Sequence, residues 1–183
     1  VFSCDLCLDR RDLHGSRRRQ RQMCLRYRSD LDVPIYIHPN NPADRPAMYQ
    51  GHSEMWGPVW SWTVETGSHA LRILFSGVFD RYPNAKLILG HMGETLPYQL
   101  WRFDSRWKIS NRGSKKLELA PSEYFKRNFW CTTAGVCSDE PMRCAIDALG
   151  VERVMFSVDY PFERSEETGE WIETAQLSTS ERV

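Results

Sequence analysis

Three apolar stretches of this 183-residue chain contain a residue that could bind a metal ion or transfer a proton. They are VPIYIHP with His38, KLILGHMGE with His91 and Glu94, and VMFSVDYPFE with Asp159. Imidazole and carboxylate groups are common ligands of divalent metals and common general acids and bases. A site built from these residues could therefore hold a metal ion and move protons at neutral pH.

The residues that precede these side chains predict buried β-strands. Each run is rich in Ile, Leu, Val or Phe and shows little polar alternation, as in a parallel sheet covered on both faces. In parallel β/α barrels the catalytic residues lie at the carboxyl ends of such strands. A lone His or Asp is more often a structural or turn residue, but its recurrence at separate strand ends favours a site. Gly90 and Gly93 predict a tight turn around His91, with Glu94 close enough to orient the imidazole.

Composition excludes several classes of protein. Lys and Arg total 24 and Asp and Glu total 24, so no net charge attracts nucleic acid or an anionic membrane. No apolar stretch approaches the roughly 20 residues that cross a bilayer, and no signal peptide is recognised. Six scattered cysteines predict free thiols in a reducing compartment. We therefore expect a cytoplasmic protein that binds neither nucleic acid nor a membrane.

The segment 1–30 differs from the rest of the chain. It is rich in Arg and Cys and lacks any apolar period. Four of its residues could form a zinc site: Cys4, Cys7, His14 and Cys24. Only the first pair has ligand spacing, however, and the basic run 17–21 is typical of a solvated surface. We expect residues 1–30 to be a disordered segment that does not match the remainder of the chain.

From residue 31 onward, strand-like and helix-like segments alternate. The predicted strands are 31–39, 85–90, 128–133 and 154–159. The predicted helices lie within 56–79, 94–107, 139–149 and 166–174. This alternation implies parallel pairing through right-handed crossovers. A complete (β/α)8 barrel needs roughly 250 residues, so residues 31–183 are expected to form an incomplete one.

Six stretches carry a resemblance to a known family: DVPIYIHP, ADRPAMYQGH, GPVWSWTVETGSHALRILFSGVFDRYP, KLILGHMGETLPYQLWRFDSRW, NFWCTTAG and RVMFSVDYPFE. They resemble the amidohydrolase superfamily and, within it, the ortho-hydroxybenzoate decarboxylases that act on γ-resorcylate or 2,3-dihydroxybenzoate. Aminocarboxymuconate-semialdehyde decarboxylases are related to this group. The resemblance implies an α/β fold in which this chain is the C-terminal half of a metal-dependent (β/α)8 TIM-type barrel, strands five to eight.

The resemblance also implies a role for individual residues. His38 and Asp159 match metal ligands of the family, and Asp159 also handles the proton. His91, with Glu94 as its hydrogen-bonded partner, matches the histidine beside the substrate. Arg102, in LWRFDSR, resembles an arginine that reaches the site of a neighbouring subunit, which implies a homo-oligomer, a dimer or tetramer. The family's first-strand ligands, a Glu or His two residues before a His or Ala, have no counterpart in this sequence.

The implied reaction is the non-oxidative decarboxylation of a small aromatic acid, 2,3- or 2,6-dihydroxybenzoate. It uses one divalent ion, Zn, Mn or Mg, and no organic cofactor. Direct loss of carbon dioxide would leave an aryl anion, so the ring carbon is protonated first, a task suited to Asp159 and His91. Two alternatives stay open. One is a metal-dependent hydrolase on the same scaffold, and the other is an inactive product of a truncated gene.

Overall fold

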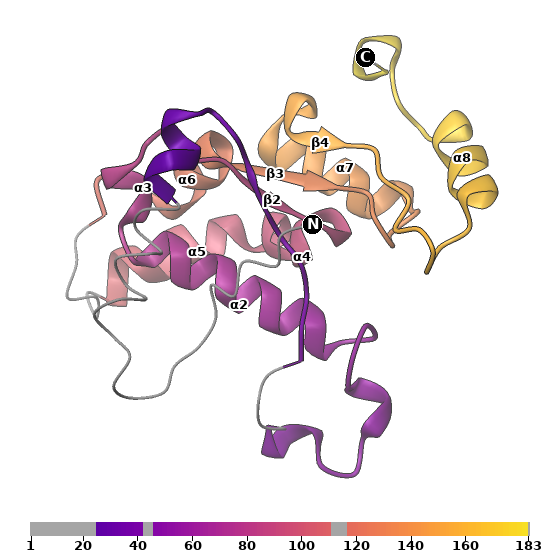
Figure 1. Cartoon of the computed structure of the whole chain (residues 1–183), viewed down its shortest axis with the longest axis horizontal. Coiled ribbons are helices and arrows are strands. Elements are labelled where there is room, and N and C mark those ends of the chain that lie inside the picture. Colours follow the sequence, from indigo (N-terminus) through magenta and orange to yellow (C-terminus); the bar gives the residue numbers. More distant parts are fainter. Residues whose placement is uncertain (1–24, 42–45, 111–116, 183) are drawn as a thin grey trace.

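The computed structural model describes residues 25–41, 46–110 and 117–182. Within them, four parallel strands form one sheet: β1 (Ile35–Ile37), β2 (Leu87–Leu89), β3 (Phe129–Thr132) and β4 (Val154–Met155). Strands that are neighbours in the sheet are also consecutive in the chain (Figure 1), which is the arrangement of a β/α barrel. The predicted parallel α/β architecture is confirmed.

Helices follow each strand, as right-handed crossovers require. They are α2 (Ser61–Phe75), α3 (Val78–Arg81), α4 (His91–Glu94), α5 (Leu96–Ser110), α6 (Pro121–Asn128), α7 (Asp139–Leu149) and α8 (Ser165–Thr174). Short 3-10 turns are η1 (Ala47–Tyr49), η2 (Ser53–Met55), η3 (Val151–Arg153) and η4 (Thr179–Glu181). In Figure 1, η1 and η2 lie in a lobe that projects away from the sheet, and α8 lies at the opposite side of the molecule from α3.

One face of the sheet packs on the helices and forms the core. Leu87, Leu89, Phe129 and Cys131 alternate along β2 and β3, and all four are buried. The ring of Phe129 lies 4.4 Å from the ring of Phe125 on α6. Side chains two residues apart on a strand point to the same face, so these positions hold the helices against the sheet.

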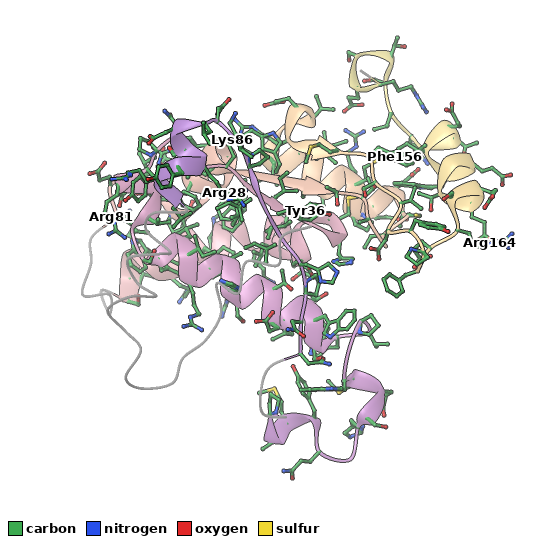
Figure 2. All side chains as sticks on the ribbon, in the orientation of Figure 1. Arg28, Tyr36, Arg81, Lys86, Phe156 and Arg164 are labelled. Carbon is green, nitrogen blue, oxygen red and sulfur yellow. The ribbon has the colours of Figure 1, made fainter. Side chains whose placement is uncertain are left out.

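The opposite face carries the intervening residues. Tyr36, Ile88 and Trp130 are in register across three strands, and the ring of Trp130 is contacted by the cations of Arg153 at 4.0 Å and Lys86 at 5.8 Å. Figure 2 shows Lys86 toward the end where β2 begins, and Phe156, which follows β4, toward the other end. The carboxyl ends of the strands therefore share one edge of the sheet.

The boundaries differ from the sequence-based expectation in two respects. Helix 139–149 is confirmed as α7, but the strands are shorter, and that predicted at 154–159 ends at Met155. Helix α6 lay outside the predicted elements. It begins with Pro121, a favoured first residue, and Asp104 of α5 accepts hydrogen bonds from the Ser122 amide at 2.9 Å and hydroxyl at 2.6 Å. Residues 1–24, with the candidate zinc ligands, lie outside the described part of the chain. Residues 25–30, expected to be disordered, are helical.

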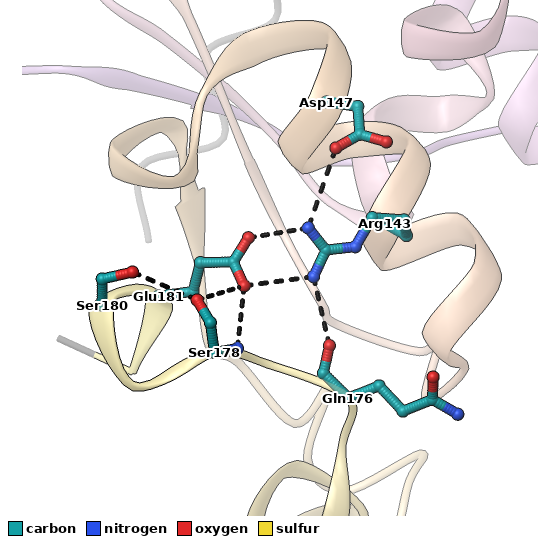
Figure 3. A network of polar contacts seen from close by, with 6 residues as sticks. All are labelled: Arg143, Asp147, Gln176, Ser178, Ser180 and Glu181. Atoms are coloured by element: carbon teal, nitrogen blue, oxygen red, sulfur yellow. Dashed lines mark hydrogen bonds and ion pairs between the residues drawn. The ribbon is translucent and has the colours of Figure 1, made fainter.

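An ion pair fastens the C-terminal segment to α7 (Figure 3). The Arg143 guanidinium donates to both Glu181 carboxylate oxygens, at 2.6 and 3.2 Å, and to the Gln176 carbonyl at 3.1 Å. Together with hydrogen bonds from Ser178, this lowers the pKa of Glu181 to about 2. A second anchor is Asp139, which accepts from the Trp171 ring nitrogen at 3.1 Å. Helix α8 and the segment that follows it are thus both bonded to α7.

None of the helices in the described residues is long and apolar enough to span a bilayer. Cys131, Cys137 and Cys144 are free thiols, as predicted. Burial raises the pKa of the Cys131 thiol to about 12, so this cysteine is a neutral part of the core.

Candidate active site

The candidate site begins at a left-handed turn directly after β2. His91, Met92, Gly93, Glu94 and Thr95 all have positive φ, from 47° to 77°. Left-handed backbone costs about 1–2 kcal/mol for each residue other than glycine. Burial of Met92 and Glu94 in the core holds the turn in place. Strain of this kind concentrates at functional sites, and here it aims the His91 side chain.

Gly93 is required in this turn by space as well as by its φ of 77°. A Cβ atom at this position would lie 3.0 Å from two ring carbons of Pro97 and 3.4 Å from the Cβ of Cys131. The tight turn predicted from Gly90 and Gly93 is therefore present. Its left-handed course over five residues was not foreseen, because the sequence contains only one glycine within it.

Glu94 orients His91, as the sequence predicted. Nδ1 of His91 lies 2.8 Å from Oε1 of Glu94, and Glu94 is only 1% exposed. This hydrogen bond is the main cause that raises the pKa of His91 above its ordinary value, against the opposing effect of burial. Oε2 of Glu94 is buried without a hydrogen-bond partner among the described residues. The pair favours the protonated imidazole, whose second nitrogen, Nε2, stays available.

Asp159, in the turn that follows β4, lies close to that second nitrogen. Its Oδ2 lies 3.7 Å from Nε2 of His91, and the residue is itself left-handed, with φ of 78°. Its carbonyl accepts hydrogen bonds from the amides of Phe162 and Glu163, at 2.9 and 3.2 Å. The turn after β4 thus presents the carboxylate to the imidazole presented by the turn after β2. Both groups remain partly accessible, at 27% for His91 and 31% for Asp159.

Gly135, in the loop after β3, has no side chain, and the side chains of His91 and Asp159 fill the space where its Cβ atom would lie. A Cβ at this position would lie 2.9 Å from Cδ2 of His91 and 3.1 Å from Oδ2 of Asp159. Its φ of 66° is also in the region that favours glycine. The residue between these two side chains must therefore be glycine, because any other residue would place a Cβ atom against them.

We expect Gly135→Ala to destabilise the protein by about 1–3 kcal/mol, because a strained φ adds to the collision. The matched control is Gly169→Ala in α8, where nothing lies within 4 Å of the added Cβ. Removing a glycine from a helix interior should stabilise by about 0.5–1 kcal/mol. Urea unfolding of both variants measures the difference. Equal stability of the two would contradict the close packing at Gly135.

His38 and Arg102 are not brought into contact with this pair. His38 follows β1 as an exposed residue, and its Nδ1 lies 2.7 Å from the Pro39 carbonyl. Arg102 is exposed on α5. In the described ranges, no three His, Cys, Asp or Glu side chains gather closely enough to hold a metal ion. The metal-ligand roles of His38 and Asp159 and the substrate role of Arg102 stay predictions.

One polar side chain of this edge escaped the sequence-based prediction. The Tyr36 hydroxyl lies 2.8 Å from Oγ1 of Thr132, across the position of Gly90. Burial, with the charges of Asp159 and Glu94 among the further causes, raises the pKa of Tyr36. The available signal was its place between Ile35 and Ile37, which assigns it to the face opposite the core.

Comparison with known proteins gives a consistent family. A family model for amidohydrolases matches residues 8–182. The γ-resorcylate decarboxylase of Polaromonas sp. is 43% identical over 156 residues, which are 83% of this chain and 47% of that enzyme. The γ-resorcylate decarboxylase of Rhodococcus jostii is 41% identical, and the match spans 84% of this chain and 47% of that enzyme.

Solved structures agree. A 2,6-dihydroxybenzoate decarboxylase in complex with 2,6-dihydroxybenzoate superposes with a TM-score of 0.84 at 37% identity, over 90% of this chain and 51% of that chain. A dihydroxybenzoic acid decarboxylase from Polaromonas sp., with bound manganese and the inhibitor 2-nitroresorcinol, superposes with a TM-score of 0.82 at 40% identity, over 89% and 50%. This chain spans about half the length of the relatives that it matches, in agreement with the predicted half of a barrel.

Proposed function

This chain belongs to the amidohydrolase family, and we propose that it forms the proton-transferring half of a metal-dependent decarboxylase of ortho-hydroxybenzoates. The observation that carries the proposal is the convergence of His91 and Asp159, with Nε2 and Oδ2 3.7 Å apart. Each residue comes from a separate strand end, and Glu94 fixes the imidazole from behind. The substrate class is taken from the relatives that match this chain. We assign the protein to the cytoplasm.

The donor types suit a divalent ion, although the described residues do not complete its ligand set. His38 and Asp159 are the residues that would hold it, and the ion would supply positive charge to the carboxylate and phenolate of the substrate. A catalytic metal normally keeps three protein ligands. Relatives bind manganese, which makes Mn²⁺ the first ion to test.

Residues of this chain supply the proton that replaces the carboxylate on the ring. The Asp159 carboxylic acid gives its proton to the ring carbon that bears the substrate carboxylate, assisted by electron release from the ortho hydroxyl. The bond between that carbon and the carboxylate then breaks, carbon dioxide leaves, and the electron pair restores the aromatic ring. His91, whose pKa is raised mainly by the hydrogen bond with Glu94, returns a proton to Asp159 and regains one from water. The sum is one proton consumed and one molecule of carbon dioxide released.

The test joins the first half of the Polaromonas enzyme to residues 31–183 of this chain, a protein we call the chimeric barrel. With Mn²⁺ and 2,6-dihydroxybenzoate in deuterium oxide, we expect release of carbon dioxide and one deuteron at the vacated ring carbon. The same assay with 2,3-dihydroxybenzoate distinguishes the two candidate substrates. Hydrolysis of esters or lactones without labelling of that carbon would support the hydrolase alternative, and no activity with any of these substrates would support an inactive product.

The chain alone is expected to bind metal weakly and to show no measurable turnover. It offers His38 and Asp159 as ligands, and two ligands are fewer than the three that a catalytic metal keeps. Calorimetric titration of the 183-residue protein with Mn²⁺, followed by an assay for carbon dioxide, checks both statements. Tight stoichiometric uptake accompanied by turnover of a dihydroxybenzoate would contradict them.

Helix α5 offers the surface for the proposed homo-oligomer. Tyr98 and Trp101 are 80% and 76% exposed, and they lie one turn of the helix from each other. Arg102 follows them on the same side. Exposed large aromatic residues beside an arginine are typical of interface hot spots. We propose that this surface carries Arg102 into the site of a neighbouring subunit, where it binds the substrate carboxylate.

We expect Arg102→Ala in the chimeric barrel to raise KM roughly tenfold to a hundredfold, because a charged hydrogen bond contributes about 1.5–3 kcal/mol. The turnover number should change little. Arg106→Ala, one turn further along α5, is the matched control and should leave KM unchanged. The oligomeric state is measured for each variant. An unchanged KM in an intact oligomer would exclude Arg102 from the substrate site.

A further inference from the structure

The segment between β4 and Asp159 lacks regular strand pairing. The amide of Thr133 donates to the Met155 carbonyl at 3.0 Å, and there β4 ends. If the two strands continued to pair, the Ser157 amide would donate a hydrogen bond to the Thr133 carbonyl. That carbonyl instead accepts the Val136 amide at 2.9 Å, in the turn that contains Gly135. The glycine turn beside His91 and Asp159 thus directs the Thr133 carbonyl to the Val136 amide and away from the Ser157 amide.

The Thr133 hydroxyl takes the place of this carbonyl. Oγ1 of Thr133 accepts the Ser157 amide at 2.9 Å and donates to the Ser157 carbonyl at 2.7 Å. One side chain therefore binds both polar backbone groups of Ser157. Thr133 is 2% exposed, so water does not compete for either bond, and its branched Cβ restricts the rotamer. A further backbone contact on this side, from the Gly135 amide to the Val158 carbonyl, is long at 3.5 Å.

We propose that Thr133 is a positioning residue, whose hydroxyl fixes Ser157 and thereby holds the Asp159 carboxylate against His91. This inference rests on the proposed function, in which Asp159 transfers the proton. Residues 157 and 159 are separated by a single residue, and Asp159 has a left-handed backbone that an unrestrained loop would leave. Without the hydroxyl, the turn would keep Gly135 in place but release the carboxylate.

The test uses the 183-residue protein without metal or substrate. Thr133→Val keeps the shape and removes the hydroxyl, whereas Thr133→Ser keeps the hydroxyl. Thr132→Val is the matched control, because it removes the neighbouring buried hydroxyl, which bonds Tyr36 instead. The readouts are the nuclear Overhauser cross-peak between the His91 ring protons and the Asp159 β protons, and the exchange rate of the Ser157 amide.

We expect Thr133→Val to lose the cross-peak and to exchange the Ser157 amide roughly tenfold faster, the scale of one lost hydrogen bond. Thr133→Ser and Thr132→Val should keep both signals. A cross-peak of unchanged intensity in Thr133→Val would overturn the proposal. If that variant does not fold, the exchange rate of the Ser157 amide is measured in the wild-type protein. An amide that exchanges as fast as an exposed loop amide would also overturn the proposal. Turnover is not measured, so failure here is distinct from failure of the decarboxylase assignment.

Discussion

Replacing Asp159 by Asn in the chimeric barrel is expected to reduce carbon dioxide release by at least about 10²–10⁴-fold, the usual contribution of a general acid. The amide has nearly the same shape as the carboxyl group but has no acidic proton to give to the ring. It is also the weaker metal ligand, because it carries no charge. The loss should therefore exceed that of a purely acid–base residue. Deuterium incorporation at the vacated carbon should fall in parallel with release of carbon dioxide.

The control for this substitution is Asp147→Asn. Asp147 is on α7, and its Oδ1 is 3.7 Å from an Arg143 nitrogen with the carboxylate largely exposed. A surface pair of this kind contributes about 0–1 kcal/mol, so activity should stay close to that of the unmodified protein. Retention of more than a tenth of the activity by Asp159→Asn would show that another group protonates the ring.

Removing the imidazole is expected to have the second largest effect. His91→Ala should lower turnover by about 10²–10⁴-fold, because Asp159 then loses the group 3.7 Å away that returns its proton. Glu94→Gln should have a smaller effect at low pH and a larger one at high pH. His52→Ala is the control, since His52 is exposed and pairs with Glu54 at 2.9 Å.

The direction of this pH dependence follows from the hydrogen bond of Glu94. That bond is the largest cause that raises the pKa of His91, so Glu94→Gln should lower it. If the imidazolium returns the proton, activity falls as pH rises through the pKa of His91. The falling limb of the pH profile should therefore move to lower pH in Glu94→Gln. A limb that stays in place would assign it to a different group.

Part of the site could be predicted from sequence because strand ends and their order follow from local pattern. The apolar runs before His91 and Asp159 predicted adjacent parallel strands, and parallel strands bring their carboxyl ends to one edge. The Glu94–His91 contact followed from spacing across a glycine turn. The parallel architecture and these positions did not require knowledge of distant contacts.

Other features depend on contacts that sequence pattern does not contain. The left-handed course of His91–Thr95 is maintained by burial of Met92 and Glu94, a tertiary effect that overrides local preference. The strand predicted at 154–159 ends at Met155, where the Thr133 carbonyl accepts the Val136 amide of the turn at Gly135 and the Ser157 amide bonds the Thr133 hydroxyl instead. The metal ion expected at His38 and the neighbouring subunit expected at Arg102 are not encoded in a local sequence pattern. The roles of these two residues therefore remain predictions.

The sequential order of the four strands has a consequence for how the chain assembles. Ile35 of β1 pairs with Leu87 of β2, whereas Cys131 of β3 pairs with Val154 of β4. The segment that connects β1 to β2 is therefore longer than the one that connects β3 to β4. The entropy of loop closure grows with the logarithm of length, and it favours the β3–β4 pair by roughly 0.7 kcal/mol. Refolding from denaturant should therefore nucleate near the C-terminus. Among these four strands β1 is synthesised before the others, so the pair with the shortest connection, β3–β4, is the last to be completed during synthesis.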